Sequence, residues 1–236
     1  MAKTKKTAVL TKEQMFGTEQ NFAVSEAYKL LRTNVMFSFP GETACPVIGV
    51  TSSLSGEGKS TTSINMAKAI AESNKKVLLI DADMRLPSVA DKLEIRLAPG
   101  LSNLLVQNLN VNGILQKFEG IETLDILTGG DIPPNPSELI GSRRMEEVIE
   151  AAKKYYDYIV IDLPPVTAVS DALSISKLLD GIVLVVRNDY AQKKAINETL
   201  RQIKLVNLKV LGFVFTCANM AQGGYYKKYY KQAVQD

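Results

Sequence analysis

A glycine-rich segment, Ser53–Ser60 (SLSGEGKS), constrains the fold of this chain more than any other stretch. An apolar run, residues 47–51, precedes it, and a helical pattern, residues 60–72, follows it. In such a unit the glycines let backbone N–H groups turn toward phosphate, the lysine reaches the terminal phosphates and the serine hydroxyl binds Mg²⁺. The usual pattern G-x-x-x-x-G-K-[ST] fails only at its first position, Ser53; the alternative is an ordinary turn before a helix. The expected phosphate-binding residues are Ser55, Gly56, Glu57, Gly58, Lys59, Ser60 and Thr61.

Composition excludes several kinds of chemistry. The sequence has no histidine, which removes Ser-His-Asp catalysis and most zinc sites, and its two cysteines, Cys45 and Cys217, share no short spacing. Catalysis must therefore use carboxylates, Lys, Arg, backbone amides or a hard metal ion. The net charge of +3 is too small to indicate nucleic acid. No apolar stretch approaches the roughly 20 residues that span a bilayer, so we expect a reduced, cytoplasmic chain.

The length of 236 residues fits one α/β domain with two extensions. Residues 1–24 lack apolar periodicity and are expected to form a flexible basic arm. The domain is expected over residues 25–222, with Ser25 as the cap of its first helix. Residues 223–236 begin with two glycines and are expected to form a flexible tail.

Short apolar runs alternate with helical patterns through the domain. Such runs are typical of strands buried on both faces of a parallel sheet. The alternation predicts a doubly wound, mostly parallel α/β sheet flanked by helices. Strands are expected near 46–51, 77–81, 124–128, 158–162, 182–186 and 210–215, and helices near 25–39, 59–73, 138–155, 171–179 and 191–206.

Charged residues end two of these strands. Asp81, Asp83 and Arg85 follow one apolar run, and Asp162 ends another. Because open α/β sheets bind ligands at the carboxyl edge, these side chains are candidates for the site. An aspartate after an apolar strand complements a phosphate loop by orienting the metal's water shell, which gives Asp162 a metal role. Asp171 is expected only to cap a helix.

Two features leave alternatives open. Glu26, Lys29 and Arg32 fall on one stripe of the first helix, where they either pair within the helix or pair between subunits. The C-terminal tyrosines could dock on the protein, contact nucleic acid or accept phosphate. In a chain that binds a nucleoside triphosphate, phosphate acceptance is the more economical interpretation. The tyrosines concerned are Tyr225, Tyr226, Tyr229 and Tyr230.

Taken together, these motifs resemble those of the bacterial tyrosine kinases of capsule and exopolysaccharide synthesis, of the cytoplasmic CpsD/CapB type. The resemblance runs from Glu26 to Tyr230. Ser53–Ser60 is similar to the family's Walker A motif, residues 80–85 (IDADMR) to its Walker A′ motif and residues 159–165 (IVIDLPP) to its Walker B motif. The tyrosine cluster closes the chain as it does in that family.

The resemblance implies a kinase that uses ATP and Mg²⁺ to phosphorylate its own C-terminal tyrosines in trans. Lys59 would hold the β- and γ-phosphates, and Ser60, Asp81 and Asp162 would organise the metal. Asp81 would take the proton of the incoming tyrosine, with Asp83 in support, although the reverse assignment stays open. Lys59, Asp81, Asp83 and Asp162 are thus the expected catalytic set.

The resemblance also implies partners. The family's E-x-x-R-x-x-R motif appears as Glu26-x-x-Lys29-x-x-Arg32, and it implies self-association in a ring. Lysine at the middle position cannot form arginine's planar fork, which would weaken that ring. A membrane protein of the polysaccharide machinery would activate the kinase at the inner face of the membrane, and a tyrosine phosphatase would oppose it.

A second group of proteins shares this sheet. Partitioning and division-site ATPases carry a signature lysine early in the loop, where this chain has Leu54. No nucleic-acid-binding helix or membrane-targeting amphipathic tail is visible in the sequence either. The alternative function is therefore a P-loop ATPase switch or scaffold that hydrolyses ATP without modifying tyrosine.

Overall fold

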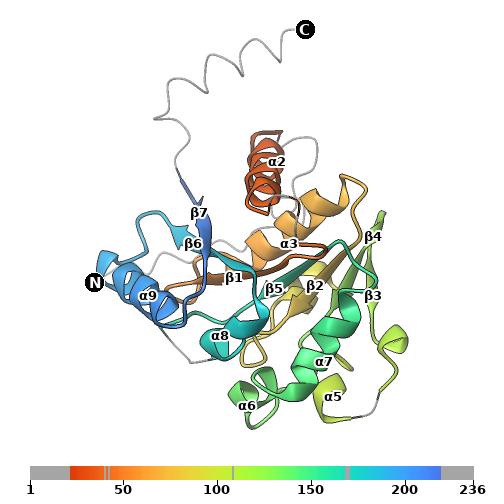
Figure 1. The fold of residues 1–236 in the computed structure, drawn as a ribbon. Coiled ribbons are helices and arrows are strands. Elements are labelled where there is room, and N and C mark those ends of the chain that lie inside the picture. The colour runs from red at the N-terminus through yellow and green to blue at the C-terminus, as the bar shows by residue number, and fades with distance from the viewer. Residues whose placement is uncertain (1–21, 40, 42, 108, 168–170, 219–236) are drawn as a thin grey trace, which may run out of the picture.

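Seven strands form the centre of the part of the chain that the structure describes (Figure 1). The structure is a computed structural model and describes residues 22–39, 41, 43–107, 109–167 and 171–218. Residues 1–21 of the predicted arm and the predicted tyrosine tail lie outside the described residues, and the arm's predicted end at residue 24 is wrong, because residues 22–24 belong to the first described helix. The strands are β1 (Val47–Ser52), β2 (Val77–Asp81), β3 (Gln116–Phe118), β4 (Ile121–Leu127), β5 (Tyr158–Asp162), β6 (Gly181–Arg187) and β7 (Val210–Thr216).

The strand order is β3-β4-β2-β5-β1-β6-β7. Only the β3–β4 pair is antiparallel; every other neighbouring pair in this described sheet is parallel. The prediction of a mostly parallel, doubly wound sheet is therefore confirmed. The carboxyl ends of β1, β2 and β5 lie next to one another at one edge, where such sheets bind ligands.

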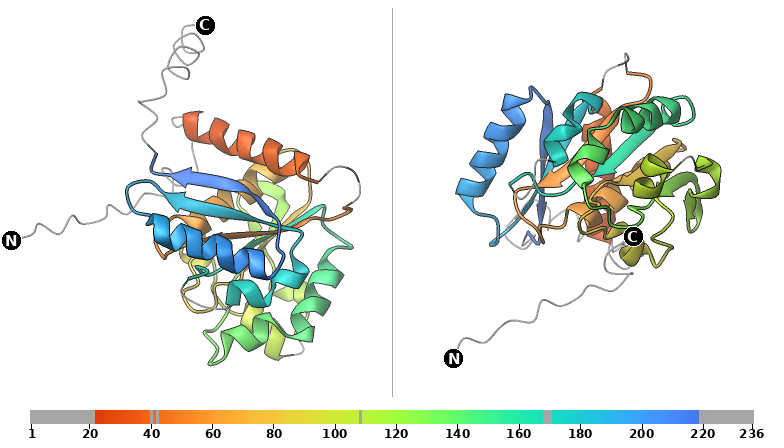
Figure 2. Two further views of the ribbon diagram at one scale, coloured as in Figure 1. Left: turned by 60° about the vertical axis from the view of Figure 1, so that its left-hand side comes forward. Right: turned by 90° about the horizontal axis from the view of Figure 1, so that it is seen from below.

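Helices cover both faces of the sheet (Figures 1 and 2). One face carries α2 (Phe22–Phe37), α3 (Lys59–Ala71) and α4 (Val89–Leu93). The other face carries α5 (Leu101–Val106), α6 (Pro136–Ile140), α7 (Arg143–Ala152), α8 (Asp171–Ser174) and α9 (Lys193–Leu205), with short 3₁₀ turns at Val111–Gly113 and Ser176–Leu178. Figure 2 shows α2 and α9 on opposite sides of β6 and β7.

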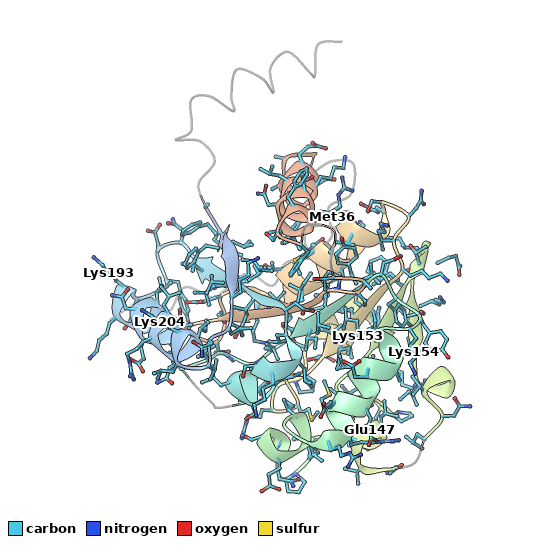
Figure 3. The ribbon with its side chains drawn as sticks, in the orientation of Figure 1. Met36, Glu147, Lys153, Lys154, Lys193 and Lys204 are labelled. Atoms are coloured by element: carbon cyan, nitrogen blue, oxygen red, sulfur yellow. The ribbon has the colours of Figure 1, made fainter. Side chains whose placement is uncertain are left out.

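Strand β2 shows why the apolar runs become buried strands. Its side chains alternate between the two faces: Val77 and Leu79 join the cluster beneath α3, and Leu78 and Ile80 join the cluster beneath α7. All four are buried. The outer faces of the helices are charged instead, as Glu147 on α7 and Lys193 and Lys204 on α9 illustrate (Figure 3).

The predicted single helix over residues 138–155 is wrong, because two helices, α6 and α7, occupy this region. Ser142 separates them with an extended backbone, and its side chain accepts a hydrogen bond from the backbone N–H of Met145 at 3.2 Å. This is an N-cap interaction, and it starts a new helix rather than continuing the old one.

Three smaller expectations also differ from the structure. Helix α2 begins at Phe22, so Ser25 lies inside it and does not cap it. Two short elements were not predicted: β3, which has three residues, and α4, which has five. Helix α8 begins at Asp171 as expected but ends at Ser174.

Among the helices of the described residues, none has both the length and the apolar character needed to cross a membrane.

Candidate active site

The phosphate-loop motif joins β1 to α3, as the sequence predicts. Gly56 and Gly58 have φ angles of 81° and 95°, in the left-handed region that favours glycine. Helix α3 begins at Lys59, directly after Gly58, so the free backbone N–H groups of its first turn face the end of the sheet. The local sequence thus forms the strand, loop and helix N-terminus that an anionic phosphate requires.

The carboxylates predicted from strand ends lie beside this loop. Strands β2 and β5 are neighbours, and Asp81 and Asp162 are direct partners in their register. Strand β1, which leads into the loop, pairs with β5 on its other side. The sheet therefore brings together Asp81, Asp83, Asp162 and Lys59, which are far apart in the sequence.

Lys59 is the centre of this group. Its Nζ lies 2.7 Å from Asp83 Oδ2 and 3.7 Å from Asp162 Oδ2, and it donates a hydrogen bond of 3.3 Å to Ser60 Oγ. Lys59 is buried. Burial opposes its charge, but the carboxylates of Asp162 and Asp83 outweigh burial, and the pKa of Lys59 is raised. The ammonium group therefore stays charged next to the place where phosphates would bind.

Asp81 is buried at the end of β2. Its Oδ2 accepts hydrogen bonds from the backbone N–H groups of Ser88 and Val89, at 3.1 and 3.0 Å. Its Oδ1 accepts one from the N–H of Asp83 at 3.2 Å. Burial, followed by the neighbouring carboxylate of Asp162, raises the pKa of Asp81 to about 8. Asp81 thus both shapes the segment after β2 and is a stronger base than an ordinary carboxylate.

Asp162, like Asp81, is fully buried. Its Oδ1 accepts a 3.0 Å hydrogen bond from Ser63 Oγ, and Ser63 was not among the predicted site residues. Its Oδ2 accepts no hydrogen bond from any residue that the structure describes. Burial raises the pKa of Asp162, against the opposing effect of Lys59. A buried carboxylate oxygen with spare acceptor capacity, beside the Ser60 hydroxyl, fits the hard oxygen ligands that Mg²⁺ prefers.

The place of Glu57 in the motif suggests that it lies among the phosphate-binding residues, but its side chain contacts the backbone at the start of the loop. Its side chain is buried, and Oε2 accepts a 3.1 Å hydrogen bond from the N–H of Ser53. Burial raises the pKa of this carboxyl group. The Glu57 side chain therefore braces the start of the loop, at the very position where Ser53 replaces the usual glycine.

The stripe on α2 makes contacts within this chain. Lys29 Nζ and Glu26 Oε1 form an ion pair of 2.7 Å, one helical turn apart. Arg32 Nη1 donates a 3.1 Å hydrogen bond to the carbonyl oxygen of Ala69 near the end of α3. The contacts of Lys29 and Arg32 place the α2 stripe away from the Lys59 cluster, on the outer side of α3.

Arg85, at the rim of the site, donates a hydrogen bond to Ser137 Oγ at 3.1 Å.

Comparisons with known proteins identify the family of this chain. The AAA domain family matches residues 45–212. The chain is 35% identical to the tyrosine-protein kinase YwqD of Bacillus subtilis (strain 168), over 90% of this chain and 89% of that protein. It is 33% identical to the putative tyrosine-protein kinase CapB of Staphylococcus aureus, over 88% of this chain and 90% of that protein.

Solved structures indicate the same family. The chimerical protein CapA2B2 has a TM-score of 0.80 and 34% identity, over 85% of this chain and 88% of that one. The kinase domain of Escherichia coli tyrosine kinase ETK has a TM-score of 0.79 and 28% identity, over 93% and 87%. A cobyrinic acid a,c-diamide synthase from Mycobacterium smegmatis, solved with an ATP analog and magnesium, is only 17% identical at a TM-score of 0.65 and shares the fold alone. This chain therefore belongs to the bacterial tyrosine-protein kinases, within the AAA domain family, and is a protein-tyrosine kinase with a P-loop nucleotide-binding fold.

Proposed function

We propose that this protein is an ATP-dependent tyrosine autokinase that phosphorylates its own C-terminal tyrosine cluster in trans. We further propose that it regulates the synthesis and export of a capsular polysaccharide or exopolysaccharide. The observation that carries the proposal is the buried Lys59, held within 4 Å of both Asp83 and Asp162 at the N-terminus of α3. An ammonium group and helix amides at one place suit the triphosphate of a nucleotide.

ATP and Mg²⁺ fit this arrangement. Residues Ser55 to Thr61 would surround the β- and γ-phosphates, and Lys59 would exchange part of its contact with Asp83 for phosphate oxygens. Mg²⁺ in nucleotide sites is usually bound by one or two carboxylates together with phosphates. Ser60 and Asp162 are the preferred ligands, with Asp81 behind them. Bound Mg²⁺ would neutralise charge on the transferring phosphoryl group.

The acceptor needs a base, because a tyrosine with a pKa near 10 is a poor nucleophile at neutral pH. We assign this role to Asp81, because its pKa of about 8 lies near neutral pH, where a general base is most effective, and because its Oδ1 accepts a single hydrogen bond from the residues that the structure describes. Asp83, paired with Lys59, would keep the ammonium group in place until the nucleotide binds. The alternative is that Asp83 is the base and Asp81 supports it. The pH profiles of kcat for Asp81→Asn and Asp83→Asn distinguish these two assignments.

We base the proposed transfer between copies on where the tail starts. The described chain leaves the sheet after β7, which is an edge strand, and the tail begins only a few residues later. The tyrosines of one copy would reach the site of a neighbour within a ring assembled through Glu26, Lys29 and Arg32. Each phosphate adds about −1.5 to −2 charges to a tail that carries three lysines and one aspartate in residues 223–236, so multiple phosphorylation reverses its charge. This reversal would release the tail.

The remaining partners come from the family. We propose that a membrane protein of the polysaccharide co-polymerase type activates the kinase at the inner face of the membrane, and that a tyrosine phosphatase reverses the modification. A role for nucleic acid is not part of the proposal, because the net charge of +3 gives little attraction for a phosphate backbone.

The test of transfer in trans uses two defective copies. The Lys59→Met protein supplies a tail without a working site, and a copy ending at residue 218 supplies a working site without a tail. Mixing them with Mg-ATP and the activator is expected to produce phosphotyrosine on the Lys59→Met chain. Absence of phosphotyrosine from the mixture, while the full-length wild type phosphorylates itself, would rule out transfer in trans.

A further inference from the structure

The outward-facing carbonyl groups of the phosphate loop are all occupied. A loop that turns its N–H groups toward phosphate turns its carbonyl groups outward, and these groups need hydrogen-bond donors of their own. Five consecutive carbonyls, from Ser53 to Glu57, each accept a hydrogen bond from a side chain. The donors, in the order of the carbonyls, are Thr167 Oγ1, Ser52 Oγ (2.7 Å), Tyr190 hydroxyl (3.1 Å), Arg187 Nη1 (3.1 Å) and Thr216 Oγ1 (2.7 Å).

Three of these donors come from the ends of β6 and β7. Arg187 and Thr216 are the last residues of the two strands and are direct partners in their register. Tyr190 lies in the turn after β6, where the Arg187 guanidinium stands 5.2 Å from the centre of its ring. The N–H of Tyr190 also donates to the carbonyl oxygen of Arg187 at 3.3 Å. The three side chains therefore form one connected unit against the outside of the loop.

The same unit lies against the two glycines with positive φ. A Cβ built on Gly58 would stand 3.3 Å from Thr216 Cγ2, and one built on Gly56 would stand 3.6 Å from the Tyr190 hydroxyl oxygen. The Tyr190 side chain is 48% exposed, so it contributes little to the hydrophobic core. Its contacts, like those of Arg187, are directed at the loop.

We propose that Tyr190, Arg187 and Thr216 are positioning residues that hold the phosphate loop in its phosphate-binding conformation before the nucleotide arrives. The inference rests on the proposed function of this loop as the ATP site. Binding to a preformed loop avoids the entropy cost of ordering it. Loss of one donor should therefore weaken nucleotide binding, whereas saturating nucleotide should restore the loop and most of the catalytic rate.

The experiment measures the Kd of a non-hydrolysable Mg-ATP analogue by calorimetry, on the full-length protein. Tyr190→Phe and Thr216→Val each remove a single hydroxyl, and each is expected to raise Kd about fivefold, the usual effect of one net hydrogen bond. Thr216→Ser keeps the donor and is expected to bind as the wild type does. For both hydroxyl-deleting variants KM for ATP should rise in proportion to Kd, while kcat for tail phosphorylation stays within about twofold.

Thr199→Val is the matched control, because the Thr199 hydroxyl on α9 is buried and bonds to no residue that the structure describes. Its Kd should equal that of the wild type. Wild-type Kd for both Tyr190→Phe and Thr216→Val would overturn the inference, as would an equal weakening in Thr199→Val. If the folded wild type binds no Mg-ATP analogue at all, the proposed ATP site fails and the inference fails with it.

Discussion

At the scale of single residues, the site concentrates more negative charge than it can neutralise. Asp81, Asp83 and Asp162 are all buried around one lysine, Lys59. Burying a carboxylate without a full partner is costly, and here the cost appears as raised pKa values for Asp81 and Asp162. Bound Mg²⁺ and an incoming tyrosine hydroxyl would interact with these carboxylates. Without them, the unneutralised buried charge lowers the free energy of unfolding.

This excess predicts how stability depends on pH without nucleotide or Mg²⁺. The pKa of Asp81 is about 8 in the folded protein, above the usual value of 3.8, so the folded state holds a proton that the unfolded state releases. The contribution of Asp81 to stability is therefore greatest below about pH 4 and declines as pH rises to about 8. Asp81→Asn removes this decline. Between pH 5 and 8.5 the wild type should lose at least about 1 kcal/mol more stability than Asp81→Asn, since one pKa unit is worth about 1.4 kcal/mol.

Urea unfolding of both proteins at the two pH values measures this difference. Parallel losses of stability in the wild type and in Asp81→Asn would show that Asp81 is ionised in the folded protein at neutral pH.

Some of the site could be predicted residue by residue, and some could not. Lys59, Asp81, Asp83 and Asp162 follow from apolar runs that end in charged residues, because parallel strands bring their carboxyl ends to one edge. Ser63 could have been found as a neighbour of Lys59 one helical turn further along α3. Tyr190, Arg187 and Thr216 carry no motif, since their role depends on the strand order β1-β6-β7.

At the scale of elements, continuous apolar runs proved to be the most reliable signal. Strands β1, β2, β5, β6 and β7 lie within about one residue of their predicted limits. In β1, β2, β5 and β6 this follows from burial on both faces, which leaves little freedom in the pattern. The antiparallel edge strand β3 was missed because it has only three residues and none of its side chains is fully buried. The α6–α7 break was missed because the apolar stripe continues across it, whereas the start of α7 is marked locally by the capping side chain of Ser142.

That side chain gives a prediction. Ser142 accepts from the N–H of Met145 at 3.2 Å and donates to the carbonyl oxygen of Leu139 at 2.7 Å, so it links the end of α6 to the start of α7. Ser142→Ala should lower the free energy of unfolding by about 1 kcal/mol, the usual loss for an N-cap. Ser142→Thr keeps the cap and should lose about half as much or less. Equal stability of Ser142→Ala and the wild type in chemical denaturation would contradict this role.

At the scale of the whole molecule, the charged residues on α2 have two possible roles. They either stabilise the helix through an ion pair within one chain or form a contact between subunits. Within one chain Glu26 is already paired with Lys29 at 2.7 Å, and exposed pairs of this kind contribute at most about 1 kcal/mol. If the stripe assembles the ring, Glu26→Ala should reduce the assembly's mass in light scattering while leaving the melting temperature nearly unchanged.

Glu150→Ala is the matched control, because Glu150 forms an equivalent pair with Lys153 on α7, also at 2.7 Å and also three residues apart. This variant should assemble as the wild type does. An unchanged mass for Glu26→Ala would assign the Glu26–Lys29 pair to helix stability alone.

The central claim is that the γ-phosphoryl group of ATP, bound at the loop Ser53–Ser60, is transferred to the tyrosine tail. The direct measurement is mass spectrometry of the C-terminal peptide, residues 219–236, after incubation of the full-length protein with Mg-ATP and the activator. The kinase account predicts phosphate on one or more of Tyr225, Tyr226, Tyr229 and Tyr230, and none in the Lys59→Met protein. Release of free phosphate with an unmodified tail would contradict it and support an ATPase switch instead.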